Sequence, residues 1–146
     1  MKIRILLCSL AMALAVVPGL RAQDAKDDTT ELGGHMQKMN AALRKLRTQL
    51  PDATKNDDSL AQVATIKDNA TAALDLKPAK LASVPDADQA KFVADYQAQI
   101  KKLIGALDDL TAALKKGDND GAQKIYAQIG QIEKEGHTEF RAKKKQ

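Results

Sequence analysis

The chain has 146 residues, of which four are aromatic and one is cysteine, and its 23 basic and 19 acidic residues give a formal net charge of +4. This length is enough for one compact domain with a hydrophobic core, and a single cysteine excludes a fold held together by internal disulfides. The chain also lacks an aromatic-and-basic patch, so we expect no nucleic acid among its partners.

The first 22 residues have the three parts of a secretory signal peptide. Lys2 and Arg4 provide a basic start, residues 5–17 form an apolar run, and the predicted cleavage follows Ala22. This apolar run is shorter than the roughly 20 residues that cross a bilayer. Cys8 lies inside the run and not at the start of the mature chain, which argues against a lipid anchor.

We therefore expect a signal peptide over residues 1–22 and one domain over residues 23–146. The domain is expected in the periplasm, without stable insertion into a membrane. Removing the first 22 residues leaves 20 basic against 19 acidic residues, so the mature domain is close to neutral.

The mature chain is rich in alanine, leucine, lysine, glutamine and aspartate and poor in aromatic and β-branched residues, which is the composition of helices. We expect no strands. The first helix begins at Asp28-Thr29-Thr30-Glu31, where Asp28 and Glu31 have the spacing of a capping box, and it stops at Pro51. Its apolar stripe consists of Leu32, Met36, Met39, Leu43, Leu46 and Leu50.

Apolar residues at helical spacing predict three more helices. The second covers about residues 59–76 and is closed by Pro78, and the segment LKPAKLASVPDAD, with two prolines, is the predicted central connection. The third helix covers about residues 87–116 and ends at Gly117, and the fourth covers about residues 121–143. Short connections make sequential helices antiparallel, so the expected all-α architecture is an up-down-up-down four-helix bundle.

This topology brings the start of the first helix and the end of the fourth to the same end of the bundle. The residues with sulfur, aromatic or imidazole groups that fall there are Met36, Met39, Phe92, Tyr96, His137 and Phe140. An imidazole and a thioether that face each other across a bundle interior could hold haem iron from its two axial sides, a pairing that favours electron transfer and raises the potential. The apolar walls that a flat porphyrin needs would be Met39, Leu43, Phe92, Tyr96 and Phe140.

Several other kinds of site are excluded by the sequence. No Cys-x-x-Cys-His motif occurs, which excludes covalent haem of the c type. The carboxylate pairs lie on polar faces or in turns, and one inward histidine cannot complete a hydrolase site. The inward Glu-x-x-His repeats of a di-iron bundle are also missing.

The chain resembles the cytochrome b562 family in four places: Met36-Gln37-Lys38-Met39-Asn40-Ala41-Ala42-Leu43, Pro78-Ala79-Lys80-Leu81, the pair Phe92 and Tyr96, and Gly136-His137-Thr138-Glu139-Phe140-Arg141. The resemblance covers essentially the whole mature chain. It implies a soluble periplasmic four-helix bundle that carries one non-covalent haem b (iron protoporphyrin IX) for electron transfer. It also implies Met36 and His137 as the axial ligands of the iron, and Phe92 and Tyr96 as aromatic haem contacts.

Two positions depart from the best-known sequences of that family, which have an arginine four residues before the histidine and an aromatic residue directly before it. This chain has Glu133 and Gly136 there, so an acid occupies the place where a cation could meet a haem propionate. His35, next to Met36, is an alternative ligand that would give a bis-histidine site. Arg141 either neutralises a propionate or is a solvated cation that complements the negative end of its helix.

We predict a monomeric periplasmic electron-transfer protein whose haem iron is held by Met36 and His137, with redox partner proteins that the sequence does not identify. Two filled axial positions argue against enzymatic turnover, so we expect that the protein is not an enzyme. The alternative is a cofactor-free periplasmic helical bundle that acts as a binding or chaperone-like module. In that case Met36 is a core residue and His137 is an ordinary helix-end histidine.

Overall fold

The computed structural model describes residues 30–142, so the predicted signal peptide over residues 1–22 lies outside the described residues. The described chain forms four α-helices and two short 3-10 helices and contains no strand. In chain order these are α1 (Glu31–Gln49), η2 (Ala53–Lys55), α2 (Asn56–Ala73), η3 (Ala79–Ser83), α3 (Asp86–Lys115) and α4 (Asn119–Phe140). The all-α prediction is confirmed.

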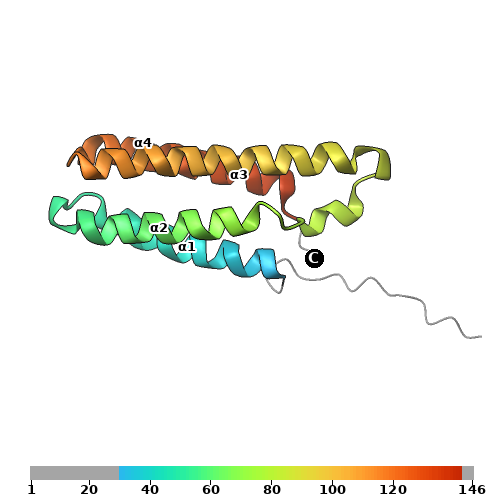
Figure 1. Cartoon of the computed structure of the whole chain (residues 1–146), viewed down its shortest axis with the longest axis horizontal. Coiled ribbons are helices and arrows are strands. Elements are labelled where there is room, and N and C mark those ends of the chain that lie inside the picture. The colour runs from blue at the N-terminus through green and yellow to red at the C-terminus, as the bar shows by residue number, and fades with distance from the viewer. Residues whose placement is uncertain (1–29, 143–146) are drawn as a thin grey trace, which may run out of the picture.

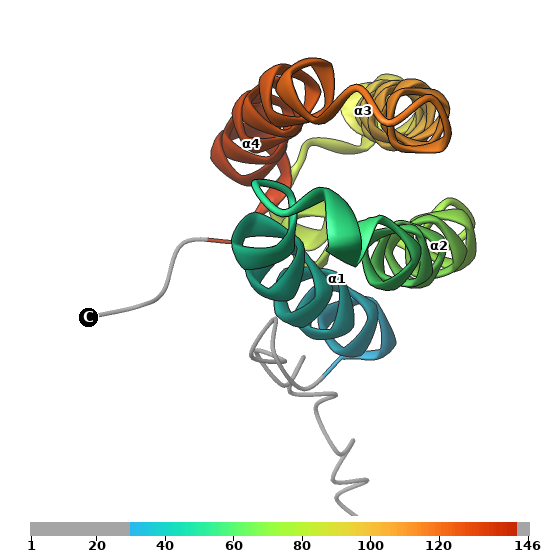
Figure 2. The same ribbon diagram turned by 90° about the vertical axis from the view of Figure 1, so that its left-hand side faces the viewer.

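Successive helices run in opposite directions along one bundle, as expected (Figure 1). α1 packs closely against α2, α2 against α3, and α3 against α4. Figure 2 looks along the helices and shows α1 and α4 as neighbours that close the ring, although these two do not approach each other as closely as the other three pairs. Within residues 30–142, none of the helices is both long and apolar enough to cross a membrane.

Two names are useful for the ends of this bundle. The loop end is where α1 leads into α2 and α3 leads into α4. The open end is where α1 begins and α4 finishes (Figure 1). Both chain segments that carry the predicted axial ligands therefore lie at the open end.

The start of α1 is capped by Thr30. Its Oγ1 accepts a hydrogen bond of 2.9 Å from the backbone N–H of Gly33, and Glu31 lies in the first turn, where the helix dipole favours an acid. Asp28, the other member of the predicted capping pair, lies outside the described residues, and the cap that the structure shows is Thr30. α1 ends directly before Leu50 and the predicted stop at Pro51.

α2 starts three residues before the predicted start at residue 59 and ends three residues before the predicted end at residue 76. Asp52 accepts a hydrogen bond of 2.9 Å from the N–H of Thr54, and this capped 3-10 turn runs directly into α2 at Asn56. After Ala73 the chain passes through η3, which lies inside the predicted central connection. The polar residues of the first turn thus belong to the helix and not to the preceding loop.

α4 starts two residues before the predicted range of 121–143. Gly117 turns the chain out of α3 with a φ of 72°, a conformation that favours glycine. The Asp118 carboxylate then caps α4 by accepting a hydrogen bond of 2.8 Å from the N–H of Gly121. α4 ends at Phe140, before the predicted end.

Two asparagine side chains tie all four helices together at the loop end. The Asn119 amide donates to the Leu50 carbonyl at 2.8 Å and to the Asn56 amide oxygen at 2.9 Å. The Asn56 amide donates back to Asn119 at 3.1 Å and reaches the Leu114 carbonyl at 3.5 Å. We call Asn56 and Asn119 the asparagine clamp. It connects the starts of α2 and α4 with the ends of α1 and α3.

Apolar side chains form a continuous core from the clamp toward the open end. The largest apolar side chains that are fully buried are Leu46, Leu50, Ile66, Leu107, Leu110, Ile129 and Val63. Burial of aliphatic side chains of this size is the main stabilising contribution in a bundle of this kind. Partly buried apolar residues pack against this core, among them Met36 and Phe92 at the open end.

Candidate functional site

A hydrogen bond joins α4 to α1 about midway along the bundle, where the Tyr126 hydroxyl donates to the Leu43 carbonyl at 3.0 Å. A cavity of about 140 Å³ lies between this bond and the open end. All four helices contribute to its walls, which are mostly apolar. Most of the lining residues come from α1 and α4, which are the least closely packed neighbours in the bundle, so the cavity lies along the seam between them.

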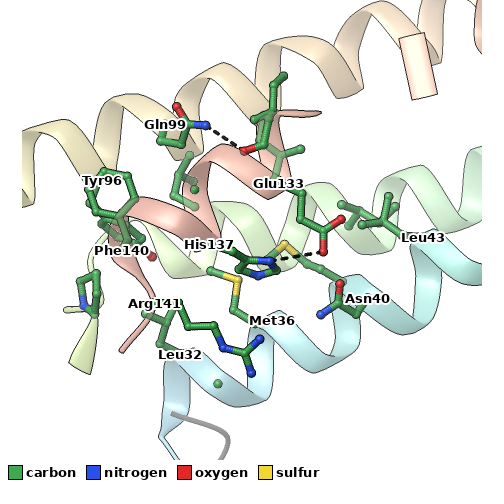
Figure 3. A pocket seen from close by; sticks show the side chains of 18 of the residues that line it. Leu32, Met36, Asn40, Leu43, Tyr96, Gln99, Glu133, His137, Phe140 and Arg141 are labelled. Atoms are coloured by element: carbon green, nitrogen blue, oxygen red, sulfur yellow. Dashed lines mark hydrogen bonds and ion pairs between the residues drawn. The ribbon is translucent and has the colours of Figure 1, made fainter. Parts of the chain in front are cut away.

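Six of the seven predicted site residues line this cavity: Met36, Met39, Leu43, Tyr96, His137 and Phe140. Figure 3 shows Met36 on α1 and His137 on α4 pointing toward each other across the seam. Met36 is partly buried, and the His137 side chain is 37% exposed, so both lie at the mouth of the cavity. The two donor atoms therefore reach one space from opposite helices.

Phe140 is the aromatic centre of the open end. Its ring meets the ring of Phe92 edge-on, with centroids 5.2 Å apart, and the ring of Tyr96 in the same manner at 5.6 Å. Phe92 is the one predicted site residue that does not line the cavity. It lies behind Phe140 and carries the Lys80 ammonium 6.0 Å from its ring centroid. The rotation of α3 about its axis thus turns Tyr96 inward and Phe92 toward η3.

Tyr96 is held by a hydrogen bond as well as by packing. Its hydroxyl donates to the Ala73 carbonyl at the end of α2, at 2.9 Å, and its side chain is buried. Burial raises the pKa of Tyr96 to about 12, because the phenolate charge would lose its hydration. This tyrosine is therefore a fixed, uncharged wall of the cavity at neutral pH.

The imidazole of His137 faces an acid of its own helix. Its Nδ1 lies 3.9 Å from Oε1 of Glu133, one turn earlier on α4 (Figure 3). The side chain of Glu133 is 34% exposed. Because Nδ1 is directed at the carboxylate, Nε2 is the nitrogen that remains for a ligand in the cavity.

His35 does not line the cavity, although it adjoins Met36 in sequence. Its Nδ1 lies 2.8 Å from Oδ1 of Asn69 on α2. The Asn69 amide nitrogen donates to the Thr65 carbonyl at 2.8 Å, so the Asn69 oxygen is the acceptor and His35 donates from Nδ1. This bond holds His35 against α2, away from the position that a bis-histidine site would require.

Gly136 borders the cavity next to His137 and faces Gln99 on α3. A Cβ atom at this position would meet Gln99 Cγ at 3.5 Å, which is an ordinary contact, so the fold does not require glycine here. Gln99 itself donates from Nε2 to the Ile132 carbonyl at 2.8 Å.

Three polar residues of the cavity wall, Gln37, Asn40 and Gln99, were not predicted from the sequence. Asn40 follows Met36 by one helical turn, so its spacing from a predicted ligand could have identified it. Gln99 has no such signal, because its place depends on how α3 and α4 lie against each other. Arg141 also lines the cavity, at the end of α4, and Figure 3 shows it beside Leu32 and Met36.

The donor set fits the iron of a flat organic cofactor better than a bare metal ion. Within residues 30–142, no group of three or more histidine, cysteine, aspartate or glutamate side chains could hold a metal ion. Met36 and His137 instead supply one soft sulfur and one nitrogen from opposite walls, which is an axial pair found in cytochromes. The cavity is smaller than the roughly 300–1,000 Å³ of most ligand sites, so a porphyrin would need the α1–α4 seam to be wider than it is in this structure.

Comparison with models of protein families matches residues 31–141, from the start of α1 to the end of α4, with the family described as Cytochrome b562. No curated protein and no solved structure matches the chain significantly. The matched residues include every part of the cavity wall.

Proposed function

The chain belongs to the cytochrome b562 family of haem-binding electron-transfer proteins, and from this premise we propose that it carries electrons in the periplasm with one non-covalent haem b between Met36 and His137. One structural observation supports this choice of ligands above all others. A thioether and an imidazole from opposite helices line the same mainly apolar cavity at the open end.

The haem supplies a one-electron couple of ferric and ferrous iron. Met36 donates from its thioether sulfur on the α1 side, and His137 donates from Nε2 on the α4 side. Met39, Leu43 and Phe140 are buried apolar walls and would exclude water from the inner part of the haem site, which lowers the local dielectric there.

Two protein ligands leave no open position on the iron for a substrate, which supports a carrier and not an enzyme. The periplasm is proposed because residues 1–22 resemble a signal peptide and because the family is periplasmic in bacteria. The partners that follow from this proposal are the haem and one or more redox proteins, with the chain itself as a monomer.

The visible spectrum of the purified domain tests the proposal. We expect one equivalent of haem to give a Soret band and, after reduction, sharp low-spin α and β bands. His137→Ala abolishes the low-spin form, whereas Met36→Ala leaves a high-spin haem that takes up added imidazole. Thr138→Ala and Lys38→Ala are the matched controls, because each removes a neighbouring exposed side chain from the same helix.

Each outcome separates the possible functions. No Soret band at one equivalent of haem contradicts the cytochrome proposal and favours the cofactor-free binding module. A low-spin spectrum that neither ligand variant alters contradicts the choice of Met36 and His137 while keeping the cofactor.

A further inference from the structure

Glu133 is the one carboxylate among the described residues that line the cavity. Its neighbour Glu135 faces the other way and pairs with Lys102 of α3 at 3.1 Å. Glu133 instead lies on the seam face of α4, with its Oε1 3.9 Å from Nδ1 of His137. The acid of the cavity and the proposed ligand are therefore an adjacent pair on one face of one helix (Figure 3).

We propose that Glu133 is the positioning residue of the axial histidine, an inference that rests on His137 being an iron ligand. Its carboxylate accepts the Nδ1–H of His137 and fixes the ring so that the Nε2 lone pair faces Met36 across the cavity. The distance of 3.9 Å closes to a hydrogen bond by a small rotation of either side chain. Bonds of this kind are often long before the ligand is bound and shorten in the complex.

Two physical effects of Glu133 act in the same direction. A carboxylate partner on the second nitrogen makes an imidazole a more basic ligand, and partners of this kind typically change metal affinity about 10–100-fold. The negative charge of Glu133 near the iron also favours the ferric over the ferrous state. Glu133 therefore lowers the reduction potential relative to the same site without the acid.

Among the described residues that line the cavity, Arg141 is the one with a permanent positive charge, and it lies on the other side of the histidine from Glu133. Arg141 follows His137 by one turn, as Glu133 precedes it by one turn, and both line the cavity. The mouth is thus acidic toward the middle of the bundle and basic toward its end. In a haem-loaded chain this polarity would favour the propionates on the Arg141 side, away from Glu133, whose carboxylate would then face the imidazole.

The tautomer of His137 in the haem-free protein tests the inference without any cofactor. We expect nitrogen NMR of the neutral imidazole to show the proton on Nδ1, and to show its loss from Nδ1 in Glu133→Leu. His35 is the internal reference, because its Nδ1 bond to Asn69 is unchanged by that substitution. A proton on Nε2 of His137 in the wild-type chain would overturn the positioning role.

The reduction potential of the haem-loaded protein is the second readout. Glu133→Leu should lower the ratio of ferric to ferrous haem affinity by at least about tenfold, which is a rise of about 59 mV for one electron. Glu133→Gln keeps an acceptor oxygen without the charge, so a smaller rise is expected. Glu135→Gln is the matched control, since it removes an acid from the α3-facing side of the same helix.

The results distinguish this inference from the proposed function. Equal potentials of Glu133→Leu and Glu135→Gln, with low-spin haem retained in both, overturn the role of Glu133 and leave the cytochrome intact. Failure of the wild-type protein to bind haem overturns the proposed function, and the NMR result still decides whether Glu133 orients His137.

Discussion

The two ends of the bundle are packed differently. At the loop end, the asparagine clamp joins all four helices, and large side chains such as Leu110 are completely buried. At the open end, α1 and α4 pack less closely, and a cavity stands where the core would otherwise continue. The hydrogen bond from Tyr126 to the Leu43 carbonyl marks the boundary between these regions.

The difference indicates that stability and binding are separated along the axis of the molecule. An underpacked seam costs stability, because cavity walls lose contacts with neighbouring atoms. The loop end can offset this cost, since the two amides of the asparagine clamp bond to each other and leucines such as Leu110 are fully buried there. The open end is then free to separate α1 from α4 when a ligand enters.

A leucine-to-alanine substitution at each end of the bundle should test this difference most directly. Leu110→Ala removes a side chain with 0% exposure near the loop end, so the free energy of unfolding should fall by about 2–5 kcal/mol. Leu32→Ala, at the cavity wall, should cost much less, because its side chain already borders an open space. Urea denaturation of the haem-free variants measures both losses in the free energy of unfolding. Equal losses would contradict the separation of stability and binding between the two ends.

The stability of the chain at alkaline pH should show that Tyr96, in the cavity wall, is shielded from water. Burial raises the pKa of Tyr96 from 10.0 to about 12, so the folded chain keeps this phenol protonated while the unfolded chain ionises it. The part of the free energy of unfolding that depends on the protonated Tyr96 is fully present below pH 10. It is lost as the pH rises toward 12, by at most about 3 kcal/mol.

Unfolding of the wild-type chain and of Tyr96→Phe across this pH range isolates the effect of that one group. The stability of Tyr96→Phe should decline less steeply with pH, although it starts lower because the bond to the Ala73 carbonyl is lost. Parallel declines in both proteins would show that Tyr96 is hydrated in solution.

The asparagine clamp should be worth less than the leucine core but more than any polar group of the open end. Asn119→Ala leaves the Leu50 carbonyl and the Asn56 amide without this partner, which should cost about 1–3 kcal/mol. Asn56→Ala should cost less stability in the Asn119→Ala background than in the wild-type chain, because the two amides act as one unit. Asn40→Ala at the cavity wall is the control, and a loss as large as that of Asn119→Ala would contradict the comparison.

Helical periodicity was enough to predict the four helices and the meeting of Met36 with His137. Both depend on local spacing and on short connections, which the sequence expresses directly. The predicted start segment of α1 contains the observed start at Glu31, but the sequence offers both Asp28 and Thr30 as caps, and the structure shows Thr30 in that role.

The clamp and the place of Phe92 could not be predicted in this way. Asn56 and Asn119 look like ordinary turn residues in sequence, and their pairing depends on how the starts of α2 and α4 lie relative to each other. Phe92 and Tyr96 share one face of α3, but a small rotation of that helix decides which of them reaches the cavity. The sequence therefore predicted the helices, but it did not predict these contacts between them.

Glycine-to-alanine substitutions in α4 give the smallest and most local test. Gly130 is exposed and a Cβ there would meet no atom within 4 Å, so Gly130→Ala should stabilise the haem-free chain by up to about 1 kcal/mol. Gly136→Ala should stabilise it similarly, since Gln99 leaves room for a methyl group at 3.5 Å. The variants should differ only in haem affinity, because the Gly136 methyl enters the cavity wall. Equal affinities would mean that the haem lies away from this part of the open end.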